Sequence, residues 1–273
     1  MNISNIIIIV ILILVIIWGL NNIFFKTNVI YDKMCDANKS SEENVNVIKS
    51  KDINENNTSN FMLSLWFYID NWGNEISNEK NILFMSKNAS STTVPELKNN
   101  LSGLSTKVTK DSVNGDFKNI NICLDKYENN LFIDVETYKE DISDKDTNFT
   151  RYKISNIAVQ KWNNLTLSID TRTLDVYLDG KLINSFILNG LYKNKYNDQT
   201  KKNIYLGNMG NSNNGFEGYI TRVRFEPTPI NPQQAYNIYR EGINSSLANS
   251  IFNKYRLKVS FLEYNKEKGA FTI

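Results

Sequence analysis

The feature that most restricts the fold is a long series of short segments in which apolar and polar residues alternate, running from Phe61 to Pro227. Successive side chains of a strand point to opposite faces, so such alternation is typical of strands that turn one face to a core. Asn, Asp, Gly or Lys bounds each segment, and no helical pattern separates them. The sequence therefore predicts an all-β fold, an antiparallel sandwich or barrel and not a parallel α/β sheet. The expected strands are Phe61–Asp70, Asn81–Ser86, Asn121–Asp125, Leu131–Tyr138, Asn163–Asp170, Leu174–Gly180, Lys181–Leu188, Asn203–Asn208 and Tyr219–Pro227.

One short helix is expected near the C-terminus. In the segment INPQQAYNIYREG, Pro232 lies near the start and Gly242 follows the end, with Ala235 and Ile238 at helical spacing. Residues 243–273 are expected to form a C-terminal extension. Within it the alternating segments YRLKVSFLEY and AFTI flank the turn NKEKG, which predicts a β-hairpin.

The first 25 residues contain an uninterrupted apolar run, IIIIVILILVIIWGL. With its apolar neighbours the run reaches the roughly 20 residues that cross a bilayer core. We expect residues 1–25 to form a transmembrane anchor, because no Lys or Arg precedes the run and no small-x-small cleavage site follows it, as a signal peptide would require. The expected anchor residues include Ile6, Leu12, Trp18 and Leu20.

Residues 26–59 are polar, charged and without periodicity, so they are expected to be a tether between the anchor and a domain at 60–242. Lys26 and Lys33 follow the anchor, and no positive side chain precedes it. This asymmetry favours a cytosolic position for the domain. The expected localisation is that of a single-pass membrane protein.

Charge and composition exclude several classes of function. The net charge is +2, from 31 basic and 29 acidic residues, which gives no electrostatic reason to expect a nucleic-acid partner. The chain has no histidine, which removes the usual catalytic triads and most zinc sites. Its two cysteines, Cys35 and Cys123, cannot form a disulfide framework; two free thiols are favoured over one bridge.

Taken in order, several segments resemble the concanavalin A-like lectin and glucanase superfamily, especially its laminin-G-like and pentraxin-like branch. The segments are FMLSLWFYI, KWNNLTLSID, TLDVYLDGKL, NIYLG, FEGYITRVRF and INPQQAYNIYREG. The resemblance covers about residues 60–242. It implies a jelly roll, that is, two curved antiparallel sheets with a concave face that many relatives use to bind glycans or proteins.

The segment LFIDVETY at Leu131–Tyr138 bears on catalysis. Glucanases that this chain resembles carry E-x-D-x-E on one strand, with the two glutamates as nucleophile and acid/base. In the matching window, Phe132 occupies the place of the first glutamate. The resemblance therefore implies a protein that is not an enzyme of this type.

Two kinds of binding residue are predicted. Alternation places four side chains of this segment on one face, which is either a ligand-binding strip or a solvated strand surface. Aromatic rings either stack on sugars or fill a core, and both interpretations are open for Trp66 and Trp162. The candidate ligand-binding residues are Phe132, Asp134, Glu136, Tyr138 and Trp66.

Calcium is a candidate cofactor. Relatives often hold Ca²⁺ with aspartate side chains at loops, so Asp170, Asp175 and Asp179 are candidate ligands. No dense D-x-D-x-D-G run is present, and no dinucleotide or phosphate-loop motif occurs.

These observations favour a non-catalytic, membrane-anchored interaction protein that binds a neighbouring structural protein. The chain is rich in Asn, Ile and Lys and is similar in design to membrane proteins of large double-stranded DNA viruses. This likeness implies a virion component between membrane and capsid, or otherwise a host-membrane protein. The alternative is a membrane-tethered lectin that binds surface glycans, and a glycoside hydrolase is the least favoured hypothesis.

Overall fold

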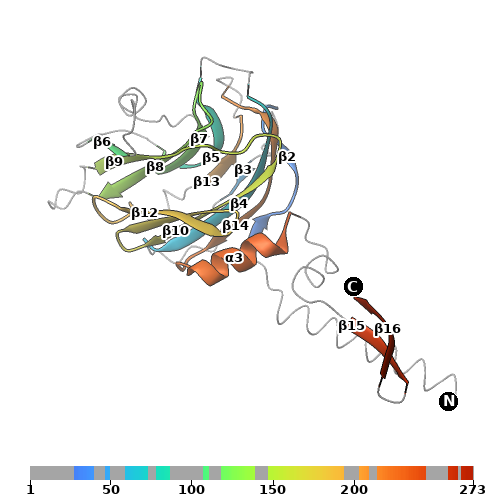
Figure 1. Ribbon diagram of the computed structural model, residues 1–273. Helices are drawn as coiled ribbons and strands as arrows, with labels where there is room; N and C mark the ends of the chain where they lie inside the picture. Colours follow the sequence, from blue (N-terminus) through green and yellow to red (C-terminus); the bar gives the residue numbers. More distant parts are fainter. Residues whose placement is uncertain are drawn as a thin grey trace. The chain divides into compact units, whose positions relative to one another are not determined.

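The computed structural model describes residues 28–39, 47–49, 59–72, 78–86, 107–110, 118–138, 147–193, 203–208, 214–243, 258–263 and 266–272. Within Val29–Ile243, two antiparallel sheets lie face to face (Figure 1). Sheet A has the spatial order β1 (Val29–Tyr31), β14 (Glu217–Glu226), β4 (Phe61–Asn71), β10 (Trp162–Asp170), β11 (Thr173–Leu178) and β12 (Lys181–Ile187), with β2 (Cys35–Asp36) also paired to β14. Sheet B has the order β3 (Val47–Ile48), β13 (Asn203–Leu206), β5 (Lys80–Ser86), β7 (Ile120–Leu124), β8 (Leu131–Tyr138), β9 (Thr147–Ile154) and β6 (Lys107–Lys110).

The core lies between the sheets and is built by the period-2 alternation of their strands. In the β10–β11 hairpin, Leu165 lies opposite Leu178, Leu167 opposite Val176 and Ile169 opposite Leu174. All of these side chains belong to or pack against one buried apolar cluster, which also takes side chains from sheet B. The fold is therefore an all-β antiparallel sandwich, as the sequence predicted.

The turn from β11 to β12 consists of Asp179 and Gly180, both with positive φ, 51° and 72°. A two-residue hairpin turn of this kind requires positive φ at both positions. A side chain at Gly180 would also meet the Cβ of Tyr239 at 2.8 Å, so the glycine allows the following helix to approach the sheet closely.

The helix α3 (Pro232–Glu241) packs on the outer face of sheet A (Figure 1). Asn231 accepts a hydrogen bond from the Gln234 backbone N–H at 2.9 Å, and the Gln234 side chain accepts one from the Asn231 N–H at 2.8 Å. This capping box satisfies two N–H groups that a helix start leaves open. The buried side chains of α3 join a second apolar cluster, made of Met62, Tyr177, Ile230, Ala235 and Ile238.

The observed elements agree closely with most of the predicted ones. The segment LFIDVETY is β8, the predicted helix is α3, and the C-terminal hairpin is present as β15 (Lys258–Glu263) and β16 (Lys266–Thr272) in a separate unit. Five strands differ from expectation. Strands β6 and β9 were not predicted, and β1, β2 and β3 lie within the expected tether and pair with β14 or β13.

The expected membrane localisation needs correction. In the part of the chain that the structure describes, no helix is long and apolar enough to cross a membrane. The helix α3 has 10 residues and a length of about 15 Å, against the roughly 30 Å of a bilayer core. The prediction of a single-pass membrane protein at a virion or host membrane is therefore withdrawn. Its anchor residues, Ile6, Leu12, Trp18 and Leu20, lie outside the described residues.

Candidate functional site

The predicted strip on β8 lies on the outer face of sheet B. Ile133 and Val135 point into the core between the sheets, whereas Phe132, Asp134 and Glu136 do not belong to that core. The latter three are nevertheless buried, with 6%, 1% and 4% of their surface exposed, and only Tyr138 is half-buried. The two carboxylates of the strip are therefore not on a solvated strand surface.

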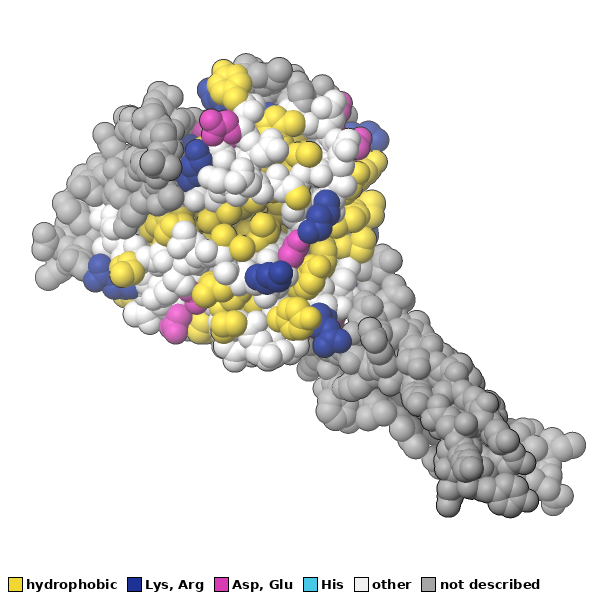
Figure 2. Space-filling view, in the orientation of Figure 1, with side chains coloured by type: hydrophobic (Ala, Val, Ile, Leu, Met, Phe, Trp, Pro, Cys, Tyr) yellow, Lys and Arg dark blue, Asp and Glu magenta, His cyan; other side chains and the backbone are white. Residues whose placement is uncertain are grey.

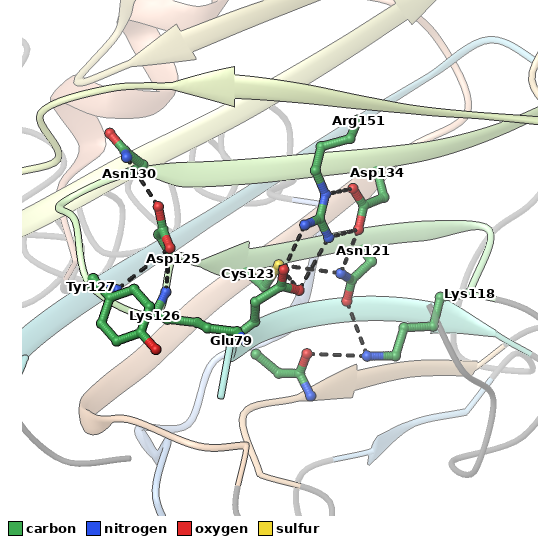
Figure 3. Close-up of polar contacts among 11 residues, drawn as sticks. Glu79, Lys118, Asn121, Cys123, Asp125, Lys126, Tyr127, Asn130, Asp134 and Arg151 are labelled. Carbon is green, nitrogen blue, oxygen red and sulfur yellow. Dashed lines mark hydrogen bonds and ion pairs between the residues drawn. The ribbon is translucent and has the colours of Figure 1, made fainter. Parts of the chain in front are cut away.

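Asp134 is held by an arginine from the neighbouring strand. Arg151 lies directly opposite Asp134 in the β8–β9 register. Its Nε donates to Asp134 Oδ1 at 2.5 Å and its Nη2 donates to Oδ2 at 2.7 Å (Figure 3). The other side of the guanidinium reaches Glu79, with Nη1 at 2.6 Å from Oε1 and Nη2 at 3.1 Å from Oε2. Arg151 thus bridges two carboxylates with paired hydrogen bonds, the strongest geometry for such contacts.

The network continues along β7 through amide groups. Asn121 lies opposite Asp134 and donates to its Oδ2 at 2.9 Å. The Asn121 side-chain oxygen accepts from Lys118 Nζ at 3.1 Å, and Lys118 also donates to Asn81 at 3.1 Å (Figure 3). The positive groups also face aromatic rings, Arg151 over Phe132 at 4.6 Å and Lys118 over Phe84 at 4.2 Å. These contacts offset the cost of burying the charges.

Electrostatics agree with this geometry. Burial alone would lower the pKa of Arg151, but the charge and hydrogen bonds of Asp134 outweigh it, so the pKa is raised and the guanidinium stays charged. Burial and the nearby Glu79 carboxylate raise the pKa of the Cys123 thiol well above its ordinary value, so this cysteine stays protonated. Cys123 and Cys35 are both buried free thiols.

Glu136, two residues after Asp134 on β8, also has charged and polar partners. Its Oε1 accepts from Lys193 Nζ at 2.8 Å, and its Oε2 accepts from the Asn119 side chain. A glycosidase needs one carboxyl group that donates a proton and one that attacks or activates water. Here each carboxylate of β8 is paired with a cation, Asp134 with Arg151 and Glu136 with Lys193.

The third predicted group, Trp66, lies on the outer face of sheet A beneath the helix. It is 6% exposed, and its ring stacks on Tyr239 of α3, with centroids 5.6 Å apart and planes 20° from parallel. This tryptophan therefore attaches the helix to the sheet, and little of it is left for a ligand.

Further along the same face, three aromatic side chains lie side by side on adjacent strands. Tyr219 of β14 is directly opposite Tyr68 of β4, which is directly opposite Trp162 of β10. Tyr219 is 43% exposed, and Tyr68 and Trp162 are half-buried. The Tyr68 and Trp162 ring centroids are 5.5 Å apart. We call these three residues the aromatic row; Figure 2 shows hydrophobic side chains among charged ones on the face that carries α3.

The three candidate calcium ligands are not brought together. Asp170 of β10 lies opposite Thr173. Asp179 directly follows Leu178, which lies opposite Leu165, five residues before Asp170 on the same strand. Five residues of a strand span roughly 16 Å. Asp175 accepts from Ser185 Oγ at 2.5 Å, and Asp179 pairs with Lys161 at 2.6 Å. Among the described residues, no group of three or more acidic or cysteine side chains is placed to hold a metal ion.

Sequence reasoning missed the partners of the strip and two members of the aromatic row. Arg151 and Glu79 belong to stretches that were not assigned to a functional face, and Tyr68 and Tyr219 were treated only as parts of strands. A signal for Arg151 was available, because a carboxylate placed at the centre of a sandwich strand requires a cation nearby. For the aromatic row the signal is the register between three strands that are distant in the sequence.

Comparison with known proteins gives a family and distant structural neighbours. A family model described as the concanavalin A-like lectin/glucanases superfamily matches residues 42–235. No curated protein sequence matches the chain.

Similar solved structures include the binding domain of botulinum neurotoxin DC in complex with rat synaptotagmin II, at 15% identity and a TM-score of 0.45 over 71% of this chain and 39% of that one. The botulinum neurotoxin serotype G binding domain has 15% identity and a TM-score of 0.45 over 78% and 46%. A Trypanosoma rangeli sialidase has 12% identity and a TM-score of 0.40 over 68% and 24%. The chain spans less than half the length of each of these structures.

Proposed function

Because the chain belongs to the concanavalin A-like lectin/glucanase superfamily, we propose that it is a carbohydrate-binding protein without hydrolase activity. The observation that carries the proposal is the paired state of both carboxylates on β8. Arg151 holds Asp134, and Lys193 holds Glu136. Asp134 and Glu136 are 1% and 4% exposed and already bonded within the protein, so neither presents a carboxyl group that is open to the glycosidic bond of a sugar.

Binding in place of turnover also fits the position of Phe132. Its ring packs under the Arg151 guanidinium at 4.6 Å. In the resemblance to the glucanase pattern E-x-D-x-E, Phe132 stands in the place of the first glutamate. An aromatic ring offers no group that attacks a sugar carbon. The outward face of β8 thus carries ion pairs and hydrogen bonds within the protein.

The experiment measures binding and cleavage on the same sugars. The chain is incubated with cellohexaose, laminarihexaose, xylohexaose and chitohexaose; calorimetry measures binding, and chromatography measures new reducing ends. We expect saturable binding of at least one hexasaccharide and no cleavage of any. Cleavage that Glu136→Gln abolishes would overturn the non-catalytic part of the proposal, and the absence of binding to every sugar would overturn the carbohydrate part.

A second candidate function, binding of a neighbouring protein, is favoured by strand β12. This strand ends sheet A, and Leu182, Ile183 and Ile187 on it are 47%, 49% and 72% exposed. An exposed apolar edge strand is a site where a partner can add a strand through backbone hydrogen bonds. Changing Ile183 and Ile187 together to Lys should reduce capture of a specific partner and leave sugar binding unchanged. Equal capture by the wild type and this double variant would argue against a protein-binding edge.

A further inference from the structure

We propose that the aromatic row, Tyr219, Tyr68 and Trp162, is the binding site, and that it takes a neutral oligosaccharide whose rings stack along it. The inference rests on the proposed carbohydrate-binding function and adds the location of the site and the class of sugar.

The row is continuous across the sheet. Tyr219, Tyr68 and Trp162 occupy directly opposed positions on β14, β4 and β10, so all three project from the same face. Neighbouring strands lie about 4.8 Å apart, which gives the row a span of about 10 Å between its first and third strands. This is the scale of a short run of linked pyranose rings, and one apolar ring per strand offers a repeated surface on which successive sugars can stack.

The chemistry of the row suits the faces of sugar rings. The face of an aromatic ring carries a partial negative charge and attracts the C–H groups that line one side of a pyranose. Tyrosine and tryptophan supply a broad, rigid contact area and lose little conformational freedom on binding. All three strands, β14, β4 and β10, lie inside sheet A and are paired on both sides, so the rings stand on a preorganised support.

Polar groups stand at both ends of the row, where the hydroxyls of a bound sugar need partners. At one end Asp36 of β2 lies directly opposite Tyr219 and pairs with Lys39 at 3.3 Å. At the other end Lys161, next to Trp162, pairs with Asp179 at 2.6 Å, and the Lys161 side chain is 58% exposed. Carboxylate oxygens accept from sugar hydroxyls and ammonium groups donate to them.

The charges at the ends cancel, and this selects the class of sugar. Each end pairs one carboxylate with one ammonium group, and the charged residues two positions from Tyr68 and Tyr219 on the same strands, Asp70 and Glu217, are acidic, so the row offers no excess positive charge that would attract a sialylated or sulfated chain. A neutral oligosaccharide needs no counter-charge and can use the apolar surface between the two ion pairs.

The small area of the row argues against a protein as its occupant. Aromatic side chains carry roughly 150–250 Å² each, and with Tyr219 at 43% exposure and the other two half-buried the row presents at most roughly 300 Å². A stable protein interface needs about 800 Å² on each partner. The available area suits stacked sugar rings.

The test measures the affinity of Tyr219→Ala and Trp162→Phe for the tightest-binding of four hexasaccharides: cellohexaose, laminarihexaose, xylohexaose and chitohexaose. Tyrosine and tryptophan are enriched among the residues that carry most of the binding energy, so we expect Tyr219→Ala to weaken binding about tenfold, which is about 1.4 kcal/mol. The control is Tyr127→Ala, because Tyr127 is 70% exposed on the β7–β8 turn of the other sheet, outside the row. It should bind like the wild type.

Two further measurements keep the outcomes distinct. Sugar binding should shift the tryptophan fluorescence of the wild type but not of Trp162→Phe, and affinity should change less than twofold between about 0.05 and 0.5 M salt, because no net charge is involved. Binding that survives Tyr219→Ala and Trp162→Phe unchanged, in variants with wild-type thermal stability, overturns the site and leaves the function standing. Failure of the wild type to bind any of the four sugars overturns both.

Discussion

On sheet B the outward side chains Asn121, Asp134, Glu136 and Arg151 are charged or amide-bearing and buried, whereas on sheet A the outward side chains Tyr219, Tyr68 and Trp162 are aromatic and partly exposed. Arg151 is 0% exposed and Tyr219 is 43% exposed. Both faces arise from the same alternation of inward and outward residues. The difference shows that polarity along a strand does not decide which face meets solvent; the partners that the fold supplies decide it.

The largest effect is expected from breaking the network of sheet B. Arg151→Met leaves the Asp134 and Glu79 carboxylates buried without the cation that bridges them. Removal of one partner from a buried ion pair costs about 3–5 kcal/mol, so urea unfolding should show a loss of this size. Lys181→Met, at an exposed position of β12, serves as the control and should lie within about 0.5 kcal/mol of wild type.

A triple variant sharpens the same point. Glu79→Met, Asp134→Leu and Arg151→Met together remove all three charges and replace them with apolar side chains. Because such replacement of a buried ion cluster is often neutral, the triple variant should recover most of the stability that Arg151→Met loses. If the triple variant is less stable than Arg151→Met, the hydrogen bonds and packing of these three residues stabilise the fold by more than the neutralisation of one another's charge.

On sheet A the corresponding change removes apolar contact beneath the helix. Ile238 is 8% exposed and packs in the cluster with Met62 and Tyr177. Ile238→Ala should lower the free energy of unfolding by about 2 kcal/mol, at the low end for truncation of a buried isoleucine. Asn237→Ala, at the exposed neighbouring position, is the control. If Ile238→Ala lowered the free energy of unfolding as much as Arg151→Met does, the proposed difference between the two faces would be contradicted.

The two buried thiols give one pH-dependent comparison. Burial raises the pKa of Cys35 in sheet A from 9.0 to about 12. The unfolded chain therefore releases this proton at lower pH than the folded one, so stability is full below about pH 9 and falls as pH rises toward 12. We expect Cys35→Ala to remove about 1 kcal/mol of the loss between pH 9 and pH 10, measured by urea unfolding. An unchanged pH dependence in this variant would contradict the assignment.

The smallest effect is expected at the start of α3. Asn231→Ala removes the side chain that accepts from the Gln234 backbone N–H at 2.9 Å. Loss of such a cap costs about 1 kcal/mol, which a thermal melt would record as a lower Tm. Asn231→Asp retains an acceptor and should restore most of the stability, and a similar loss in both variants would show that the cap is not the cause.

The sequence was sufficient for the strands whose alternation is regular, such as β8 and β10, and for α3 with its Pro232 start and Gly242 end. It did not predict β9, TNFTRYKI, in which the apolar Phe149 lies on the outward face with Arg151 and Lys153 and interrupts the alternation. Arg151 is buried with Asp134 of β8 and with Glu79, which directly precedes β5, as its ion-pair partners. The burial of Arg151 depends on contacts between segments that are distant in the sequence, and a local pattern does not contain these contacts.

The candidate sites show the same limit. The alternation on β8 separated Ile133 and Val135 from Asp134 and Glu136 correctly, yet it gave no indication that the second pair is buried. Trp162 was identified as an aromatic worth attention, but its neighbours Tyr68 and Tyr219 come together only through the order β14, β4, β10. Strand order is a property of the whole sandwich and cannot be derived from any one segment.

The central claim is that sheet A presents an open binding face and sheet B a closed one. Hydroxyl-radical footprinting of the whole chain, with and without the hexasaccharide that binds it, tests this most directly. The account predicts that Tyr219 and Trp162 are oxidised in the free protein and protected by the sugar, while Phe132 and Phe84 are unreactive in both states. Oxidation of Phe132 in the free protein, or protection by the sugar on β8 in place of the aromatic row, would contradict it.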